Sequence, residues 1–204
     1  LTGNTVTTTS LGSTIAGAGN SLAVVGNASI AGDVSNVSTV DVSGTTRLAA
    51  NVSSTANQTY VGAITLGADA TVLTNGTSAV ITTTSTVNSD GTARALTLNA
   101  TGTTGKVRVA SALGDTAALA ALVVNASNLA LNGANIDTTG NQTYTGAVTL
   151  GADTRLRASG NAAQINLANA IDSDTTARNL TIAASGTNGP VSYTHLRAHE
   201  TGRN

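Results

Sequence analysis

Apolar and polar residues alternate in short runs along the chain. Such runs include "KVRVASAL" (106–113), "AALVVNAS" (120–127), "LALNGANI" (129–136), "GAVTL" (146–150), "AQINLANAI" (163–171) and "RNLTIAAS" (178–185). Turn formers such as "GAD", "SGN" and "TTGN" separate the runs, which predicts many short β-strands. In a strand, this alternation places Val107 and Val109 on one face and their neighbours on the other. One segment, "DTAALAALVV" (115–124), is also compatible with a short helix.

A long internal repeat organises these runs. The segment "NQTYVGAITLGAD" starts at Asn57 and "NQTYTGAVTLGAD" starts at Asn141, an offset of 84 residues. The copies 57–105 and 141–189 align without a gap, with about half of their positions identical. The sequence therefore divides into a partial unit or units (1–56), a complete repeat (57–140), a partial second repeat (141–189) and a tail (190–204) that falls outside the pattern.

Composition narrows the fold further. Hydrophobic residues make up 40% of the 204 residues, and Phe, Trp, Met and Cys are absent. A core without large aromatic side chains must be thin, which favours an elongated β-solenoid over an ordinary globule. With about 20 residues per coil, one repeat is about four coils, and roughly nine coils make a rod ~40–45 Å long. Tandem β-sandwich domains, one per repeat, are the alternative architecture.

Charge and hydropathy exclude several classes of protein. The formal net charge is -1 and 9% of residues are charged, so the chain offers no basic face for nucleic acid. Its apolar runs are far shorter than the ~18 residues of a membrane span, so no membrane insertion is expected. The sequence starts at Leu1 rather than methionine, which suggests an internal fragment, and such a fragment shows no signal peptide.

The repeat resembles a known type. The segments "TGNQTYTGAVTLGADTRL" (139–156) and "ARNLTIAASGTNG" (177–189) are similar to repeats of filamentous haemagglutinin-like and autotransporter-associated β-strand repeat surface proteins. The resemblance covers about residues 37–189. It implies a right-handed parallel β-helix that is exported across the outer membrane and displayed on the bacterial cell surface. The signal peptide, secretion-signal domain and translocator of that family do not occur in this sequence.

These observations lead us to expect a structural or adhesive segment of a secreted bacterial surface protein. The expected partners are a host-cell or glycan receptor and, during export, an outer-membrane translocator; no cofactor, metal or enzymatic activity is expected. The alternative is an extracellular polysaccharide-acting β-helix enzyme that uses aspartates.

The aspartates occur at equivalent repeat positions. Asp69 corresponds to Asp153, and Asp90 corresponds to Asp174. A catalytic group rarely recurs in every unit, whereas a turn residue does, because an Asp side chain bonds nearby backbone N–H groups. We therefore expect these four side chains to stabilise turns.

Four other recurring residues are candidate surface contacts. Tyr60 and Tyr144 could stack on sugars, and Arg94 and Arg178 could contact an anionic glycan. The simpler interpretation is that each tyrosine packs at a coil corner with its hydroxyl in water. In that interpretation each arginine is solvated and covers a strand edge.

The tail contains both histidines, His195 and His199, and the only glutamate, Glu200. A four-residue spacing on a helix would let the histidines bind one metal ion. However, residues 191–201 match, residue for residue, one reading frame of the transposase adapter used in sequencing libraries. We therefore interpret residues 190–204 as an adapter-derived artefact that neither continues the coils nor binds zinc.

Overall fold

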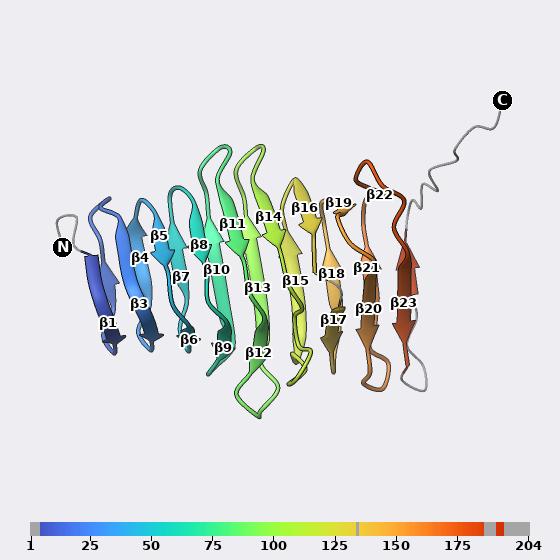
Figure 1. Ribbon diagram of the computed structural model, residues 1–204, viewed down its shortest axis with the longest axis horizontal. Helices are drawn as coiled ribbons and strands as arrows, with labels where there is room; N and C mark the ends of the chain where they lie inside the picture. The colour runs from blue at the N-terminus through green and yellow to red at the C-terminus, as the bar shows by residue number, and fades with distance from the viewer. Residues whose placement is uncertain (1–4, 134, 186–190, 194–204) are drawn as a thin grey trace.

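The chain is an all-β solenoid. The computed structural model describes residues 5–133, 135–185 and 191–193. Within these residues the secondary structure consists of parallel β-strands without helices, wound into about eight turns (Figure 1). The solenoid prediction is confirmed, and the alternative of tandem β-sandwiches is wrong because each strand pairs in parallel with its counterpart one coil away. In the described part, no helix has the length and hydropathy needed to cross a bilayer.

Each coil contributes strands to three faces. The first face contains β5 (Val40–Val42), β8 (Gln58–Tyr60), β11 (Val80–Thr83), β14 (Lys106–Val109), β16 (Asn128–Leu131), β19 (Ala147–Leu150) and β22 (Ile171–Ser173). The second face contains β6 (Thr46–Leu48), β9 (Ile64–Leu66), β12 (Val87–Ser89), β17 (Asn135–Thr138), β20 (Thr154–Ala158) and β23 (Leu180–Ala184). The third face contains β2 (Ile15–Ala16), β4 (Val34–Val37), β7 (Val52–Ser54), β10 (Ala70–Thr74), β13 (Ala95–Ala100), β15 (Ala121–Asn125), β18 (Gln142–Tyr144), β21 (Ile165–Leu167) and β24 (Val191–Tyr193).

Two long strands join the first and second faces near the N-terminal end. These are β1 (Thr5–Leu11) and β3 (Leu22–Ile30), which pair with each other. Residues 22–24 of β3 pair with β5, and residues 28–30 pair with β6. Further along, the second face narrows to one residue, Leu113, which bridges Val87 and Ile136 between β12 and β17.

Stacked side chains fill the interior of the coils. Val40, Gln58 and Ile81 lie in register on successive strands of the first face, and each is 0% exposed. Alternation within the strands sends their neighbours outward, as the buried–exposed–buried pattern of β5 shows. Burial of each such aliphatic side chain contributes about 1.5–3 kcal/mol, so the slim core stabilises the rod coil by coil.

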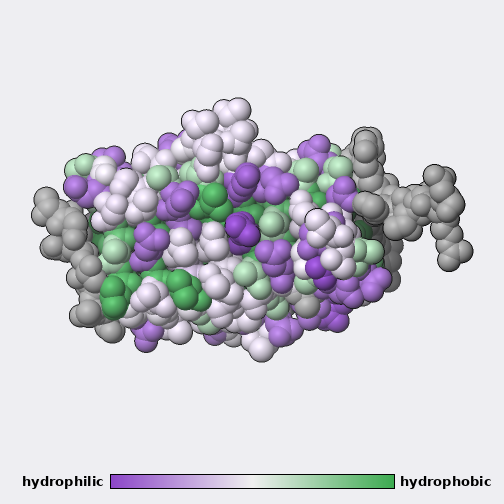
Figure 2. All heavy atoms as spheres, turned by 45° about the horizontal axis from the view of Figure 1, so that its top comes forward, coloured by the Kyte–Doolittle hydropathy of each residue, from purple (hydrophilic) through white to green (hydrophobic). Residues whose placement is uncertain are grey.

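The outside of the rod is mostly polar. Figure 2 shows hydrophilic and intermediate residues over most of the side it draws, with smaller hydrophobic areas between them. Among the residues whose burial is described, Val25 and Val61 are the exposed large hydrophobic ones. The hydrophobic effect therefore acts mainly in the interior.

The repeat does not fit a whole number of turns. Strand β8 lies on the first face, whereas its counterpart one repeat later, β18, lies on the third. Likewise β10 lies on the third face and its counterpart β20 on the second. From β8 to β18 the chain completes three turns and passes two further faces, if the bridge at Leu113 counts as a strand. One repeat is thus three and two-thirds coils rather than four, and the second copy is rotated about the axis relative to the first.

Several apolar runs turn a corner that the sequence does not reveal. The run 163–171 enters two strands, β21 and β22, and the run 129–136 enters β16 and β17. The segment 115–124, compatible with a helix by sequence, instead forms a corner followed by β15. The helical interpretation is wrong because pairing with β13 and β18 satisfies the backbone of β15 between two neighbouring strands.

The start of the tail does join the coils. Strand β24 pairs with β21 through Ile165↔Val191 and Leu167↔Tyr193. The prediction that the whole of 191–204 stays outside the coils is therefore wrong for residues 191–193. An alternating segment can extend the edge of a sheet because the edge strand presents unpaired N–H and C=O groups. His195, His199 and Glu200 lie outside the described residues, and the adapter origin of the tail stays a prediction.

Candidate functional site

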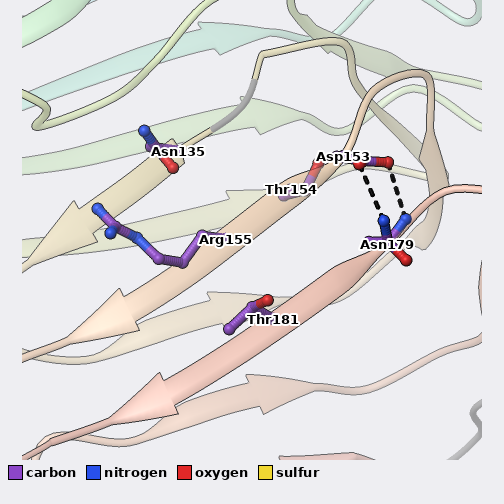
Figure 3. A pocket seen from close by; sticks show the side chains of 6 residues that line it. All are labelled: Asn135, Asp153, Thr154, Arg155, Asn179 and Thr181. Carbon is purple, nitrogen blue, oxygen red and sulfur yellow. Dashed lines mark hydrogen bonds between the residues drawn. The ribbon is translucent and has the colours of Figure 1, made fainter.

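An open polar pocket lies on the second face toward the C-terminal end of the rod. It has a volume of about 340 Å³. It is lined by Asn135, Asp153, Thr154, Arg155, Asn179 and Thr181 (Figure 3). These residues come from β17, β20, β23 and the turns that lead into β20 and β23. Each strand belongs to a different coil, so the pocket exists only because three coils stack in register.

Strand register places the floor of the pocket. Asn135 pairs with Arg155, and Arg155 pairs with Thr181, so the three side chains form one row across β17, β20 and β23. Figure 3 shows these side chains on neighbouring strands, with Asp153 and Asn179 at the turn side. The row alternates with the buried residues Ile136 and Leu156, which fix the outward direction of the polar side chains.

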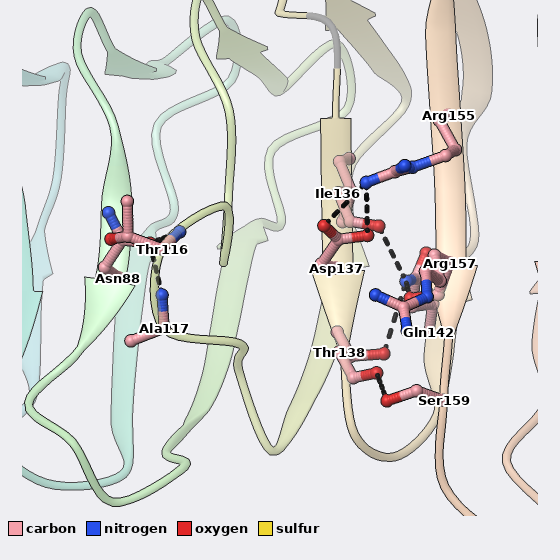
Figure 4. Close-up of polar contacts among 10 residues, drawn as sticks. All are labelled: Asn88, Thr116, Ala117, Ile136, Asp137, Thr138, Gln142, Arg155, Arg157 and Ser159. Atoms are coloured by element: carbon pink, nitrogen blue, oxygen red, sulfur yellow. Dashed lines mark hydrogen bonds and ion pairs between the residues drawn. The ribbon is translucent and has the colours of Figure 1, made fainter.

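An ion pair holds Arg155 across the strands. Its Nη2 atom donates to both carboxylate oxygens of Asp137, at 2.9 and 3.3 Å (Figure 4). The side chain of Asp137 is only 10% exposed, whereas that of Arg155 is 43% exposed. The Nε atom of Arg155 is buried and makes no hydrogen bond to another described residue. Arg155 therefore balances a nearly buried carboxylate while the rest of its guanidinium lines the pocket.

Asp153 is occupied by structural hydrogen bonds. Its two oxygens accept from the backbone N–H of Asn179 at 2.9 Å and from the Asn179 side-chain amide at 3.0 Å. These bonds, the backbone one first, hold the pKa of the Asp153 carboxyl below its ordinary value. Asp69, the counterpart in the first copy, accepts from the backbone N–H of Ala95 at 2.9 Å. Both aspartates thus connect one coil to the next.

The same connection recurs along the rod with asparagine. Asn57 accepts from the backbone N–H of Val80, and Asn141 accepts from that of Gln164, each at 2.9 Å. In every case the side chain precedes a strand and bonds the residue aligned with it one coil later. Asn51 bonds Thr71 in this way. The predicted structural use of these polar residues is confirmed, although the bond reaches the neighbouring coil rather than the local turn.

Asp90 and Asp174 bracket a protruding turn. Each accepts a bond from the backbone N–H two residues later and a forked pair of bonds from an arginine four residues later. The side-chain bond from Arg94 lowers the pKa of Asp90, and the bond from Arg178 lowers that of Asp174. The turn role predicted for these carboxylates is confirmed. Arg94 and Arg178 are partly exposed, so part of each guanidinium stays accessible.

Both recurring tyrosines are core residues. Tyr60 is 0% exposed and Tyr144 is 1% exposed. The hydroxyl of Tyr60 donates to Oε1 of Gln58, and that of Tyr144 donates to Oε1 of Gln142, both at 2.8 Å. Burial raises the pKa of both phenols. The prediction that these residues reach the surface or leave their hydroxyls in water is wrong, because a buried glutamine supplies the partner that water would otherwise provide.

Sequence reasoning missed the pocket. Its floor residues Asn135, Arg155 and Thr181 are far apart in sequence and carry no motif, and only the strand register unites them. One signal was available: the first copy has Thr71 where the second has Arg155, and Ala95 where the second has Asn179. Such differences between otherwise similar copies mark positions that the common fold does not require.

The pocket holds a single carboxylate, that of Asp153. Within the described residues there is no group of three or more His, Cys, Asp or Glu side chains that could hold a metal ion. Comparisons with known proteins found no matching family model, no matching curated protein and no matching solved structure.

Proposed function

We propose that this chain is a structural and adhesive repeat segment of a secreted bacterial surface protein, either a filamentous haemagglutinin-like adhesin or an autotransporter passenger. The observation that carries the proposal is the continuity of the rod. The second copy continues the coil stack of the first without a break, as the pairing of β15, β18 and β21 illustrates. A repeat that extends its own edge suits a spacer that separates a binding site from a cell.

The bonds between coils support the same role. Asn57, Asp69, Asn141 and Asp153 each join a side chain to the backbone of the following coil. Stability of this kind comes from neighbouring coils and is approximately additive along a solenoid. Length can therefore grow without the need for a larger core.

The repeat resemblance and the absence of cysteine suit export to an oxidising compartment. The partners in this proposal are an outer-membrane translocator during export and a host-cell or glycan receptor afterwards. Exposed parts of Arg94 and Arg178 are available for weak contacts with such a receptor.

The alternative, a polysaccharide-acting enzyme that uses aspartates, has less support. Glycoside hydrolysis generally uses two carboxyl groups on opposite sides of the scissile bond. Asp153 lies in the pocket, but both its oxygens accept bonds from Asn179 and its lowered pKa makes it a weaker base. The neighbouring Asp137 is nearly buried and paired with Arg155.

Surface display tests the proposal. The chain is placed as the passenger of an outer-membrane autotransporter translocator, and whole cells are treated with protease and stained with antibody. We expect a folded, surface-exposed passenger and more attachment to host cells than with the translocator alone. A passenger that stays inside, or displayed cells that attach no better than the control, would contradict it. Release of reducing ends from bacterial or host polysaccharides, lost in Asp153→Asn, would favour the enzyme instead.

A further inference from the structure

We propose that the pocket formed by Asn135, Asp153, Arg155, Asn179 and Thr181 binds one unit of a neutral saccharide. This inference goes beyond a stalk or adhesive role, because it assigns a ligand class to one site and does not depend on where the rod is displayed. It rests on the chemistry of the free polar groups in the pocket and on the difference between the two repeat copies.

The pocket offers donors and acceptors in mixed array. The side chains of Asn135 and Thr181 make no hydrogen bond to another described residue, so an amide and a hydroxyl are free. Arg155 uses Nη2 for Asp137, which leaves Nη1 as a donor. Asn179 uses its amide nitrogen for Asp153, which leaves its oxygen as an acceptor. Neighbouring hydroxyls of a sugar both donate and accept, and this array matches them.

Charge argues against other ligands. The positive charge of Arg155 is already balanced by Asp137, and Asp153 adds a negative charge at the wall, so a sulfate or carboxylate gains little there. A divalent cation would meet one carboxylate only, whereas Ca²⁺ takes six to eight oxygen ligands. An apolar ligand would leave the polar lining without partners, which costs free energy. A neutral polyhydroxylated group satisfies the lining without adding charge.

The first repeat copy has the same framework without the pocket chemistry. Asn51, Asp69 and Thr97 stand where the second copy has Asn135, Asp153 and Thr181. However, the oxygen of Asn51 accepts a bond from the backbone N–H of Thr71, whereas the amide of Asn135 is unbonded. Arg155 is replaced by Thr71 and Asn179 by Ala95 in the first copy. The second copy thus carries a site that the solenoid itself does not need.

The size and openness of the site set the expected affinity. A volume of about 340 Å³ accommodates a monosaccharide unit. The pocket has no aromatic residue on which a sugar ring could stack, and solvent reaches it freely. We therefore expect a dissociation constant on the order of 1–10 mM for one saccharide unit, with stronger apparent binding only when several units are engaged together.

Nuclear magnetic resonance titration of the full 204-residue chain tests the inference. The probes are methyl β-glucopyranoside, methyl β-galactopyranoside and N-acetylglucosamine, with sodium sulfate and glucuronate as anionic probes. We expect backbone amide shifts at Asn135, Asp153, Arg155, Asn179 and Thr181 with at least one neutral probe and smaller or no shifts there with the anions. The double variant Asn179→Ala and Thr181→Ala should weaken binding about 10-fold or more.

Matched variants keep the test decisive. Thr97→Ala changes the first-copy counterpart of Thr181 and should leave binding unchanged. Arg155→Lys keeps a positive partner for Asp137, so the fold is preserved, but it removes the guanidinium and should also weaken binding. Absence of local shifts with all three neutral probes, stronger shifts with sulfate, or unchanged binding in the double variant would overturn the assignment. Each of these results leaves surface display intact, so it is distinguishable from a failure of the proposed function.

Discussion

The hydroxyls of Tyr60 and Tyr144 donate the same 2.8 Å hydrogen bond to a glutamine two residues earlier, yet the two tyrosines lie on different faces of the rod. Gln58 in turn donates to the backbone oxygen of Leu73, and Gln142 donates to that of Arg157 (Figure 4). The whole buried network has been carried from one face to another. The core environment is therefore set by the local sequence of strands and corners rather than by a particular side of the rod.

Removal of either phenol should destabilise the rod by a similar amount. Tyr60→Phe and Tyr144→Phe each leave a buried glutamine oxygen without its donor, and we expect a loss of about 1–3 kcal/mol in the free energy of unfolding. Urea denaturation measures the change. Val61→Ala, at a residue that is 47% exposed, serves as the control and should change stability little. A loss below ~0.3 kcal/mol for both tyrosine variants would show that the network adds nothing to stability.

Alkaline pH should unfold the protein through the same two residues. Burial raises the pKa of Tyr60 and Tyr144 in the folded chain, so each phenol is neutral there when it ionises in the unfolded chain. Their contribution to stability is complete below the unfolded pKa of about 10 and falls above it by about 1.4 kcal/mol per pH unit for each phenol. The double Phe variant should show a weaker decline between pH 10 and about 11.5 in denaturant titrations. Parallel pH profiles for the two proteins would contradict this assignment.

Close stacking at one corner should reject even a methyl group. A Cβ atom at Gly62 would meet the carbonyl group of Gly44, and one at Gly44 would meet that of Gly26 in the preceding coil. Gly62→Ala should therefore cost about 1–3 kcal/mol, because the clash is with backbone that cannot rotate away. Thermal unfolding reports the loss. Gly12→Ala, where a Cβ would meet nothing within 4 Å, is the matched control, and equal losses at both sites would refute the steric explanation.

The bond from Asn57 to the next coil should depend on its oxygen. Asn57→Ala removes the acceptor for the backbone N–H of Val80 and should cost about 0.5–1.5 kcal/mol in the free energy of unfolding. Asn57→Asp retains an acceptor, as Asp33, Asp69 and Asp153 do at equivalent places, and should be tolerated near neutral pH. Chemical denaturation of the three proteins in parallel distinguishes these effects. Equal destabilisation by Ala and Asp would mean that the amide nitrogen, not the oxygen, matters.

Much of the fold follows from sequence because strands obey a simple alternation. The runs 146–150, 178–185 and 120–127 correspond to β19, β23 and β15, with small shifts at their ends. The repeat and the thin aliphatic composition are sufficient to predict a solenoid. Corners are harder to predict, since an apolar run such as 129–136 continues through a bend without a change in hydropathy.

The angular position of the second copy was not predictable for a related reason. The connection between aligned positions varies from 18 residues, between Asp33 and Asn51, to 26 residues, between Asp69 and Ala95. A mean coil length therefore cannot give the number of turns in 84 residues. Burial of Tyr60 was missed because its partner, Gln58, is a polar residue that alternation alone places in the core but hydropathy does not.

The rotation between copies has a consequence for any longer array of this unit. Three consecutive units would make eleven coils, about 53 Å at ~4.8 Å per coil, before a given residue returned to its original side. Equivalent residues would thus follow a spiral with three directions per period. A neighbouring molecule approaching from any of these directions would meet the same chemistry at a different height, so such an array would have no unique front or back.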